Sequence, residues 1–118
     1  MKWEGSIVFM GITDMEKTDS FYREKLGLEL YKDQGLCRIY IVPGGGMLGF
    51  CTHQEVVSRD KSPIITLLTP DVEDCHKALK EKGVKVEEKP KINPRFKIHH
   101  FFLQDPDGYT VEIQRFLE

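Results

Sequence analysis

The feature that most constrains the fold is a repeat of strand and helix signals 57 positions apart. The apolar run SIVFMGIT (6–13) precedes Asp14, a good helix N-cap, and a helical pattern that stops at Gly27. The run PIITLLT (63–69) precedes Asp71 in the same way, and a second helical pattern follows it. The sequence therefore predicts two copies of one strand-helix unit.

Three more strands are predicted after each helix. Turn residues separate them, because glycine reaches positive φ without steric cost, and the DPDG stretch (105–108) is a tight turn. The predicted strands are 28–32, 37–42 and 47–52 in the first half, and 84–89, 95–103 and 109–116 in the second.

Each half then has the order β-α-β-β-β, and a unit this small cannot bury the face of its own sheet. Two paired modules would solve this problem. We expect an α+β fold in which the modules form a curved mixed sheet, with helices on the outer face and a cup on the inner face. The whole chain, 1–118, is predicted to be one domain: module 1 is about 5–53, a linker is about 54–62, and module 2 is about 63–117.

Composition excludes several classes of function. The 17 Lys and Arg residues are interspersed among 19 Asp and Glu residues, which argues against nucleic-acid binding. No apolar run is long enough to span a bilayer, and the start, MKWEGSIVF, does not resemble a signal peptide. We expect a cytoplasmic protein with no membrane partner. Cys37, Cys51 and Cys75 form no C-x-x-C pair, so they are expected to be reduced thiols.

Two motifs, FYREKLG (21–27) and DPDGYTVE (105–112), together with the duplicated β-α-β-β-β unit, resemble the vicinal-oxygen-chelate superfamily of glyoxalase, bleomycin-resistance and extradiol-dioxygenase relatives. The resemblance implies the duplicated fold. In metal-using relatives it also implies one divalent ion in the cup, held by a side chain from the first strand of each module and an acid from the last strand of one or both. The ion would act as a Lewis acid on vicinal substrate oxygens.

Carried onto this chain, the first-strand ligand positions are Ile7 and Ile64, which cannot bind a metal. The acid of module 1 would lie near Gly49, where there is no carboxylate, and the acid of module 2 is Glu112. One carboxylate is too few for a catalytic divalent ion. We therefore predict no cofactor, with an altered metal site around Glu112 as the alternative.

The same resemblance, with strand alternation, gives the inward-facing residues. His100 would lie beside Glu112 and form a hydrogen-bonded acid–imidazole pair, which is the candidate catalytic pair; its bland alternative is a structural role for both residues. The candidate ligand-binding residues are Ile7, Phe9, Met47, Cys51, Ile64, Thr66, Phe102, Thr110 and Gln114.

Three functions are compatible with this cup. The first is a metal-free module that binds a small, partly apolar or aromatic molecule, as the bleomycin-binding relatives do. The second is an enzyme: either a lyase or isomerase of the glyoxalase kind with an altered site around Glu112 and His100, for which Cys51 and His53 are further candidates, or a metal-free acid/base catalyst that uses the Glu112–His100 pair. The third is a structural or interaction module. A homodimer is expected in each case, because the modules can pair within a chain or across a two-fold axis.

Overall fold

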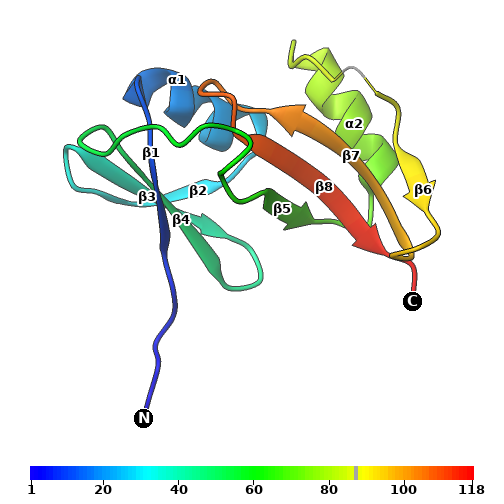
Figure 1. The fold of residues 1–118 in the computed structure, drawn as a ribbon, viewed down its shortest axis with the longest axis horizontal. Coiled ribbons are helices and arrows are strands. Elements are labelled where there is room, and N and C mark those ends of the chain that lie inside the picture. Colours follow the sequence, from blue (N-terminus) through cyan, green and yellow to red (C-terminus); the bar gives the residue numbers. More distant parts are fainter. Residues whose placement is uncertain (87) are drawn as a thin grey trace. The chain divides into compact units, whose positions relative to one another are not determined.

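The computed structural model describes residues 1–86 and 88–118. The chain divides into two compact units, Met1–Ser58 and Arg59–Glu118, and each has the element order β-α-β-β-β (Figure 1). The predicted α+β class and the duplicated module are confirmed. Each unit forms its own four-stranded mixed sheet.

Unit 1 begins with a strand and a helix whose ends follow from the sequence. The Asp14 carboxylate accepts a hydrogen bond from the Lys17 backbone N–H at 3.1 Å, as expected of an N-cap. Gly27 adopts a φ of 75° after the helix ends. The elements of unit 1 are β1 (Val8–Gly11), α1 (Met15–Asp19), the π-helical turn η1 (Ser20–Lys25), β2 (Glu29–Asp33), β3 (Cys37–Val42) and β4 (Gly46–Cys51).

The sheet of unit 1 has the order β1-β4-β3-β2, in which β1 and β4 are parallel and the other pairs are antiparallel. Its helix-facing side carries aromatic residues: Tyr22 stacks on Phe50 with ring centroids 4.4 Å apart. Tyr40 donates a hydrogen bond of 2.6 Å to the buried carboxylate of Asp19. Arg23 also donates to that carboxylate, so the buried charge is paired.

Unit 2 repeats this topology with the order β5-β8-β7-β6, in which β5 and β8 are parallel. Its core is aliphatic and aromatic, with Phe101, Val111 and Ile113 almost fully buried on the side that faces α2. Figure 1 shows α2 running beside β7 and β8. The elements of unit 2 are β5 (Ile65–Leu68), α2 (Val72–Glu81), β6 (Lys91–Asn93), β7 (Ile98–Gln104) and β8 (Thr110–Phe116).

The turn between β7 and β8 forms as predicted. The Asp105 carboxylate accepts hydrogen bonds from the backbone N–H groups of Asp107 and Tyr109, each at 2.9 Å. Gly108 adopts a φ of 90°, which a residue with a side chain would resist. This turn fixes the register of the last two strands and hence the face on which each side chain lies.

The predicted strand over 84–89 is wrong: the structure has no strand there among the described residues, and Glu87 lies outside them. The strand that forms is β6, which lies between the predicted strands 84–89 and 95–103. The reason is the turn that follows, because the Asn93 side chain accepts hydrogen bonds from the backbone N–H groups of Arg95 and Phe96. A hairpin closed at Asn93 pairs the residues just before it, and Pro90 cannot donate to a ladder.

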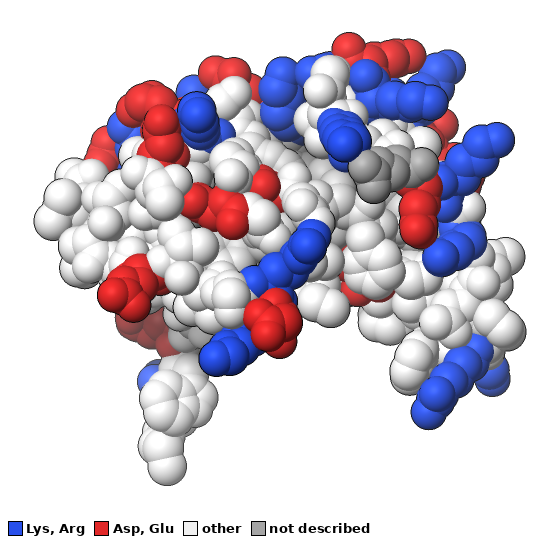
Figure 2. All heavy atoms as spheres, turned by 45° about the horizontal axis from the view of Figure 1, so that its top comes forward, with Lys and Arg blue, Asp and Glu red and all other residues white. Residues whose placement is uncertain are grey.

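No helix within residues 1–86 and 88–118 is long and apolar enough to cross a membrane. On the face drawn in Figure 2, basic and acidic side chains are interspersed over the surface.

Candidate functional site

The sheet of unit 2 has one side that α2 does not cover, called here the open face of unit 2. Strand register places Thr66, Glu112 and Phe102 in one row across this face. The next row holds Leu68, Gln114 and His100. His99 lies on the opposite side, where its Nε2 is 3.1 Å from the Glu73 carboxylate of α2. The structure therefore brings His100, and not His99, beside Glu112.

Glu112 is a buried carboxylate whose two oxygens both have partners. Thr66 Oγ1 donates to Oε1 at 2.8 Å, and His100 Nδ1 lies 2.8 Å from Oε2. An ionised carboxylate only accepts hydrogen bonds, so Nδ1 carries the hydrogen and a neutral ring has its lone pair at Nε2. Glu112 thereby fixes the tautomer of His100, and the pair has the arrangement of a carboxylate-oriented general base.

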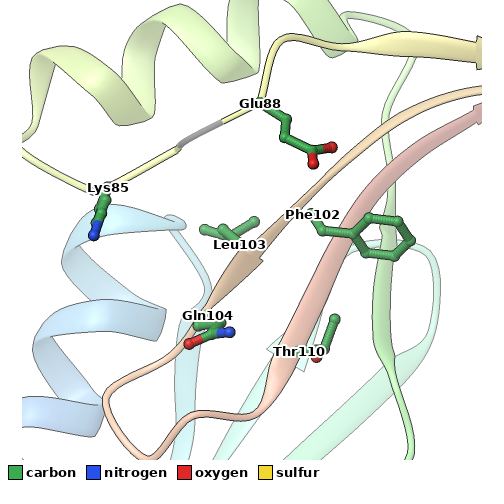
Figure 3. A pocket seen from close by; sticks show the side chains of 6 residues that line it. All are labelled: Lys85, Glu88, Phe102, Leu103, Gln104 and Thr110. Atoms are coloured by element: carbon green, nitrogen blue, oxygen red, sulfur yellow. The ribbon is translucent and has the colours of Figure 1, made fainter.

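Phe102 contacts His100 and also lines a pocket. Its ring meets the His100 ring edge-on, with centroids 5.1 Å apart, and the side chain is 39 % exposed. The pocket has a volume of about 590 Å³ (Figure 3). It is lined by Lys85, Glu88, Phe102, Leu103, Gln104 and Thr110.

The pocket lies where the edge of β7 extends beyond its partner. β6 pairs with β7 only at residues 98–100, so the edge of β7 at 102–104 faces the segment between α2 and β6. Figure 3 shows the Glu88 carboxylate directed from this segment toward β7. Sequence analysis identified Phe102 and Thr110 but missed the other four lining residues. Lys85 and Glu88 were assigned to a strand that does not form.

The predicted site residues of unit 1 lie on the open face of its own sheet, which is the side that α1 does not cover. Phe9 pairs with Gly49 in the register of β1 and β4. A Cβ built on Gly49 would lie 2.4 Å from the Phe9 ring, so the ring occupies the space where a side chain at position 49 would stand. Ile7 and Met47 are partly buried, and Cys51 is fully buried.

The residues at the metal-ligand positions implied by the resemblance do not fit a metal ion. Ile7 and Ile64 offer only hydrocarbon, and the Phe9 ring fills the space beside Gly49. Both oxygens of Glu112 already accept hydrogen bonds. No chemical step is therefore assigned to an ion at these positions.

The prediction that all three cysteines are reduced thiols is wrong for two of them. Cys37 and Cys51 form a disulfide between β3 and β4, and Cys75 is the free cysteine. The sequence carried a signal for this pair, because the two cysteines lie at equal distances from the turn at 43–45. A hairpin of that register places them directly opposite each other.

Comparison with known proteins agrees with this architecture. The model of the Glyoxalase/Bleomycin resistance protein/Dioxygenase superfamily matches residues 7–113. The chain belongs to this superfamily. The search of curated proteins finds no match.

Solved structures of the glyoxalase/bleomycin resistance/dioxygenase superfamily and of other proteins share the fold. Integron cassette protein HFX_CASS4, from the mobile metagenome of the Halifax Harbour sewage outfall, is 24% identical with a TM-score of 0.80, covering 94% of this chain and 97% of that one. A superfamily member from Sphaerobacter thermophilus is 21% identical with a TM-score of 0.77, covering 97% and 98%. TioX from Micromonospora sp. ML1 is 15% identical with a TM-score of 0.78, covering 96% and 98%. Identities this low support the fold alone, so function has to be argued from the site.

Proposed function

We propose that this superfamily member binds a small, partly apolar or aromatic molecule on the open face of unit 2, without a metal ion. The observation that carries the proposal is the exposed ring of Phe102 in the wall of a pocket of about 590 Å³. Pockets for small molecules are typically apolar and aromatic, with a few polar groups that fix orientation. Here Thr110, Gln104 and Lys85 supply those polar groups.

The buried pair of His100 and Glu112 does not line the pocket itself but lies against Phe102, which does. Because Glu112 holds Nδ1 of His100, Nε2 is the ring atom that is left to accept a hydrogen bond. We expect the ligand to place a flat apolar part against Phe102 and to be oriented by polar groups around it. The loss of ligand chemistry at Ile7, Ile64 and Gly49 supports recognition without a metal.

The test is a thermal-shift screen of partly apolar and aromatic compounds, followed by calorimetry on those that raise the melting temperature. Phe102→Ala should weaken binding at least tenfold. The matched control is Phe96→Ala, because Phe96 is 64 % exposed in the turn between β6 and β7 and does not line the pocket. The proposal would be contradicted by a screen that finds no binding compound, or by compounds that bind Phe102→Ala as tightly as the parent.

A second candidate function rests on the hydrogen bond between His100 and Glu112. A histidine oriented by a carboxylate is a general base, so the pair suits proton abstraction next to a carbonyl in a lyase or isomerase reaction. Incubating small hydroxycarbonyl compounds with the protein in D₂O, with NMR detection of deuterium uptake, tests this function. Uptake should require both residues, and uptake that persists in Glu112→Gln would rule out this assignment.

We also propose that the protein forms a homodimer. Leu68, in the edge strand β5, is 62 % exposed, and Ile64, just before that strand, is 54 % exposed; this is apolar surface that a second copy would cover. Light scattering at micromolar concentration tests the proposal, and a monomer there would contradict it.

A further inference from the structure

We propose that Cys37, Cys51 and His53 form a redox-controlled binding site for Zn²⁺. The ion binds when the two cysteines are reduced, and it is released when they form the disulfide. The site lies in unit 1 and shares no residue with the open face of unit 2. The proposal therefore goes beyond the proposed function and does not depend on it.

The first support is the placement of the three side chains. Cys37 and Cys51 are direct cross-strand partners in β3 and β4, with Cα atoms 4.1 Å apart. His53 follows two residues after the end of β4, and its Nδ1 lies 3.8 Å from Cys37 Sγ. The three ligand atoms lie within 4.8 Å of one another. In residues 1–86 and 88–118, this is the one group of three or more His, Cys, Asp or Glu side chains close enough to share an ion.

The second support is that the backbone fixes the histidine. Thr52 N–H donates to the carbonyl oxygen of Leu36 at 2.9 Å, on one side of His53. On the other side, the backbone at Gln54 and Glu55 lies directly against Gly11. A Cβ on Gly11 would stand 2.0 Å from the Glu55 carbonyl oxygen, so this approach needs the glycine. The backbone of His53 is therefore held close to the two cysteines by its neighbours in the chain.

The third support is the match to zinc dimensions. Tetrahedral zinc has Zn–S bonds of about 2.3 Å and Zn–N bonds of about 2.0 Å, which place sulfur and nitrogen ligands about 3.6 Å apart. The distance of 3.8 Å from Cys37 Sγ to His53 Nδ1 is close to this spacing. Two thiolates and an imidazole are soft and borderline donors, which suit Zn²⁺ and not Mg²⁺ or Ca²⁺. His53 is exposed, so water or a further donor can reach the fourth position.

Reduction and oxidation of the two cysteines control the site. An external dithiol reduces the Cys37–Cys51 disulfide to two thiols and itself becomes a disulfide. Zn²⁺ then replaces the two thiol protons, which are released to solvent. Hydrogen peroxide with two protons reverses the change: the thiolates give up two electrons and form the disulfide, Zn²⁺ leaves, and two waters result. In a reducing compartment of the kind expected from the sequence, the thiol form would prevail.

The experiment uses the full chain, reduced with a phosphine under anaerobic conditions and titrated with Zn²⁺ against a chromophoric chelator. One equivalent should bind tightly, and peroxide should release it. Co²⁺ should give the near-ultraviolet charge-transfer band of a site with two thiolates. Cys37→Ser and His53→Ala should each weaken Zn²⁺ binding at least tenfold. The matched controls Cys75→Ser and His76→Ala, on α2, should bind as the parent does.

Several results would overturn the proposal. One is reduced protein that binds Zn²⁺ no more tightly than its oxidised form, and another is His53→Ala that retains full affinity. Because Cys51 is fully buried, a serine there threatens folding. The Co²⁺ spectrum of the unmutated protein therefore provides an independent measurement, and a band intensity that corresponds to fewer than two thiolates would also overturn the proposal. Loss of the Zn²⁺ site would leave small-molecule binding at the pocket beside Phe102 unchanged. The two proposals can therefore fail separately.

Discussion

The two units have the same topology, yet their open faces carry opposite chemistry at matching positions. In unit 1 one row across the sheet holds Phe9 and Gly49, and in unit 2 the matching row holds Thr66 and Glu112. Phe9 and Thr66 are themselves 57 positions apart. In unit 1 this row therefore has an aromatic ring packed over a glycine, whereas in unit 2 it has a carboxylate that accepts a hydrogen bond.

The neighbouring row differs as sharply. Cys37 and Cys51 are partners in unit 1, whereas His100 and Gln114 are the partners at the matching positions of unit 2. The fold thus fixes where side chains meet but not what they do. One ladder position supports a disulfide in one copy and half of an acid–imidazole pair in the other.

The largest expected difference in stability between the units is at Gly11 of unit 1 and its counterpart Leu68 of unit 2. Gly11→Ala should destabilise the protein by about 3 kcal/mol, because its Cβ would collide with the backbone at Glu55. Leu68→Ala removes a side chain that is 62 % exposed and should cost below about 0.5 kcal/mol. Chemical denaturation measures both. Equal stabilities of the Gly11→Ala and Leu68→Ala variants would mean that the backbone at Gln54 and Glu55 does not lie against β1.

The next effect concerns two pairs of His and Glu in unit 2. Glu112→Ala leaves Thr66 Oγ1 and His100 Nδ1 without their acceptor in a buried place, which should cost about 2 kcal/mol. Glu73→Ala removes the partner of His99, but the Glu73 side chain is 68% exposed, so its loss should cost below about 0.5 kcal/mol.

Denaturation of both variants checks the contrast, and ¹⁵N NMR of the imidazole rings provides a second readout. The His100 ring should lose its single tautomer in Glu112→Ala and keep it in Glu73→Ala. If the two variants were equally stable, the buried His100–Glu112 pair would contribute no more to stability than the exposed His99–Glu73 pair.

Part of the candidate site can be predicted from the sequence. The side-chain period of β7 and β8 and the DPDG turn are local properties, but the histidine that shares a face with Glu112 was predicted from the parity that the family resemblance implies. The hydrogen bond to Thr66 depends on a parallel partner 46 residues away, and local patterns do not encode it. The fold class follows from the repeat of strand and helix signals 57 positions apart, because those signals are also local patterns.

The misses have equally physical causes. The alternating pattern over 84–89 predicts a strand, but the Asn93 turn selects which residues pair with β7, so the strand is β6. The pocket residues Lys85 and Glu88 were lost with that error. The disulfide was not predicted because the three cysteines are odd in number, widely spaced and form no C-x-x-C pair, although hairpin register places Cys37 opposite Cys51.

A third difference between the units is electrostatic. Asp19 on α1 is matched 57 positions later by His76 on α2. Hydrogen bonds from Arg23 lower the pKa of Asp19 from 3.8, against the opposing effect of burial and with help from Tyr40. A lowered folded pKa means that this contribution to stability is present above pH 3.8 and is lost as the pH falls through the folded value.

Asp19→Asn should therefore flatten the acid side of the stability curve. Below pH 3.8 the unfolded parent binds a proton that the folded parent does not, which gives a slope of up to about 1.4 kcal/mol per pH unit. Urea denaturation between pH 2 and pH 6 measures the slope of both proteins. Tyr40→Phe removes one donor to Asp19 and should give a smaller change of the same sign. Identical slopes in parent and Asp19→Asn would show that unit 1 gains no stability from the paired charge.

The smallest effect tests the row that distinguishes the open faces. Gly49→Ala should cost about 1 kcal/mol, because the Phe9 ring, 44 % exposed, has room to swing away from a new Cβ. In a Phe9→Ala background the same change should be close to neutral. The coupling in this double-mutant cycle should therefore be about 1 kcal/mol, measured by chemical denaturation.

The cycle also shows why unit 1 has no acid in this row. If the coupling is present, the Phe9 ring and Gly49 depend on each other. A carboxylate at position 49 then requires that the ring be replaced by a hydrogen-bond donor. Thr66 is that donor in unit 2, where it holds Glu112. The double variant Phe9→Thr with Gly49→Glu should then be more stable than Gly49→Glu alone, since the threonine both makes room and donates to the acid. A coupling near zero would mean that the two faces diverged at each position independently.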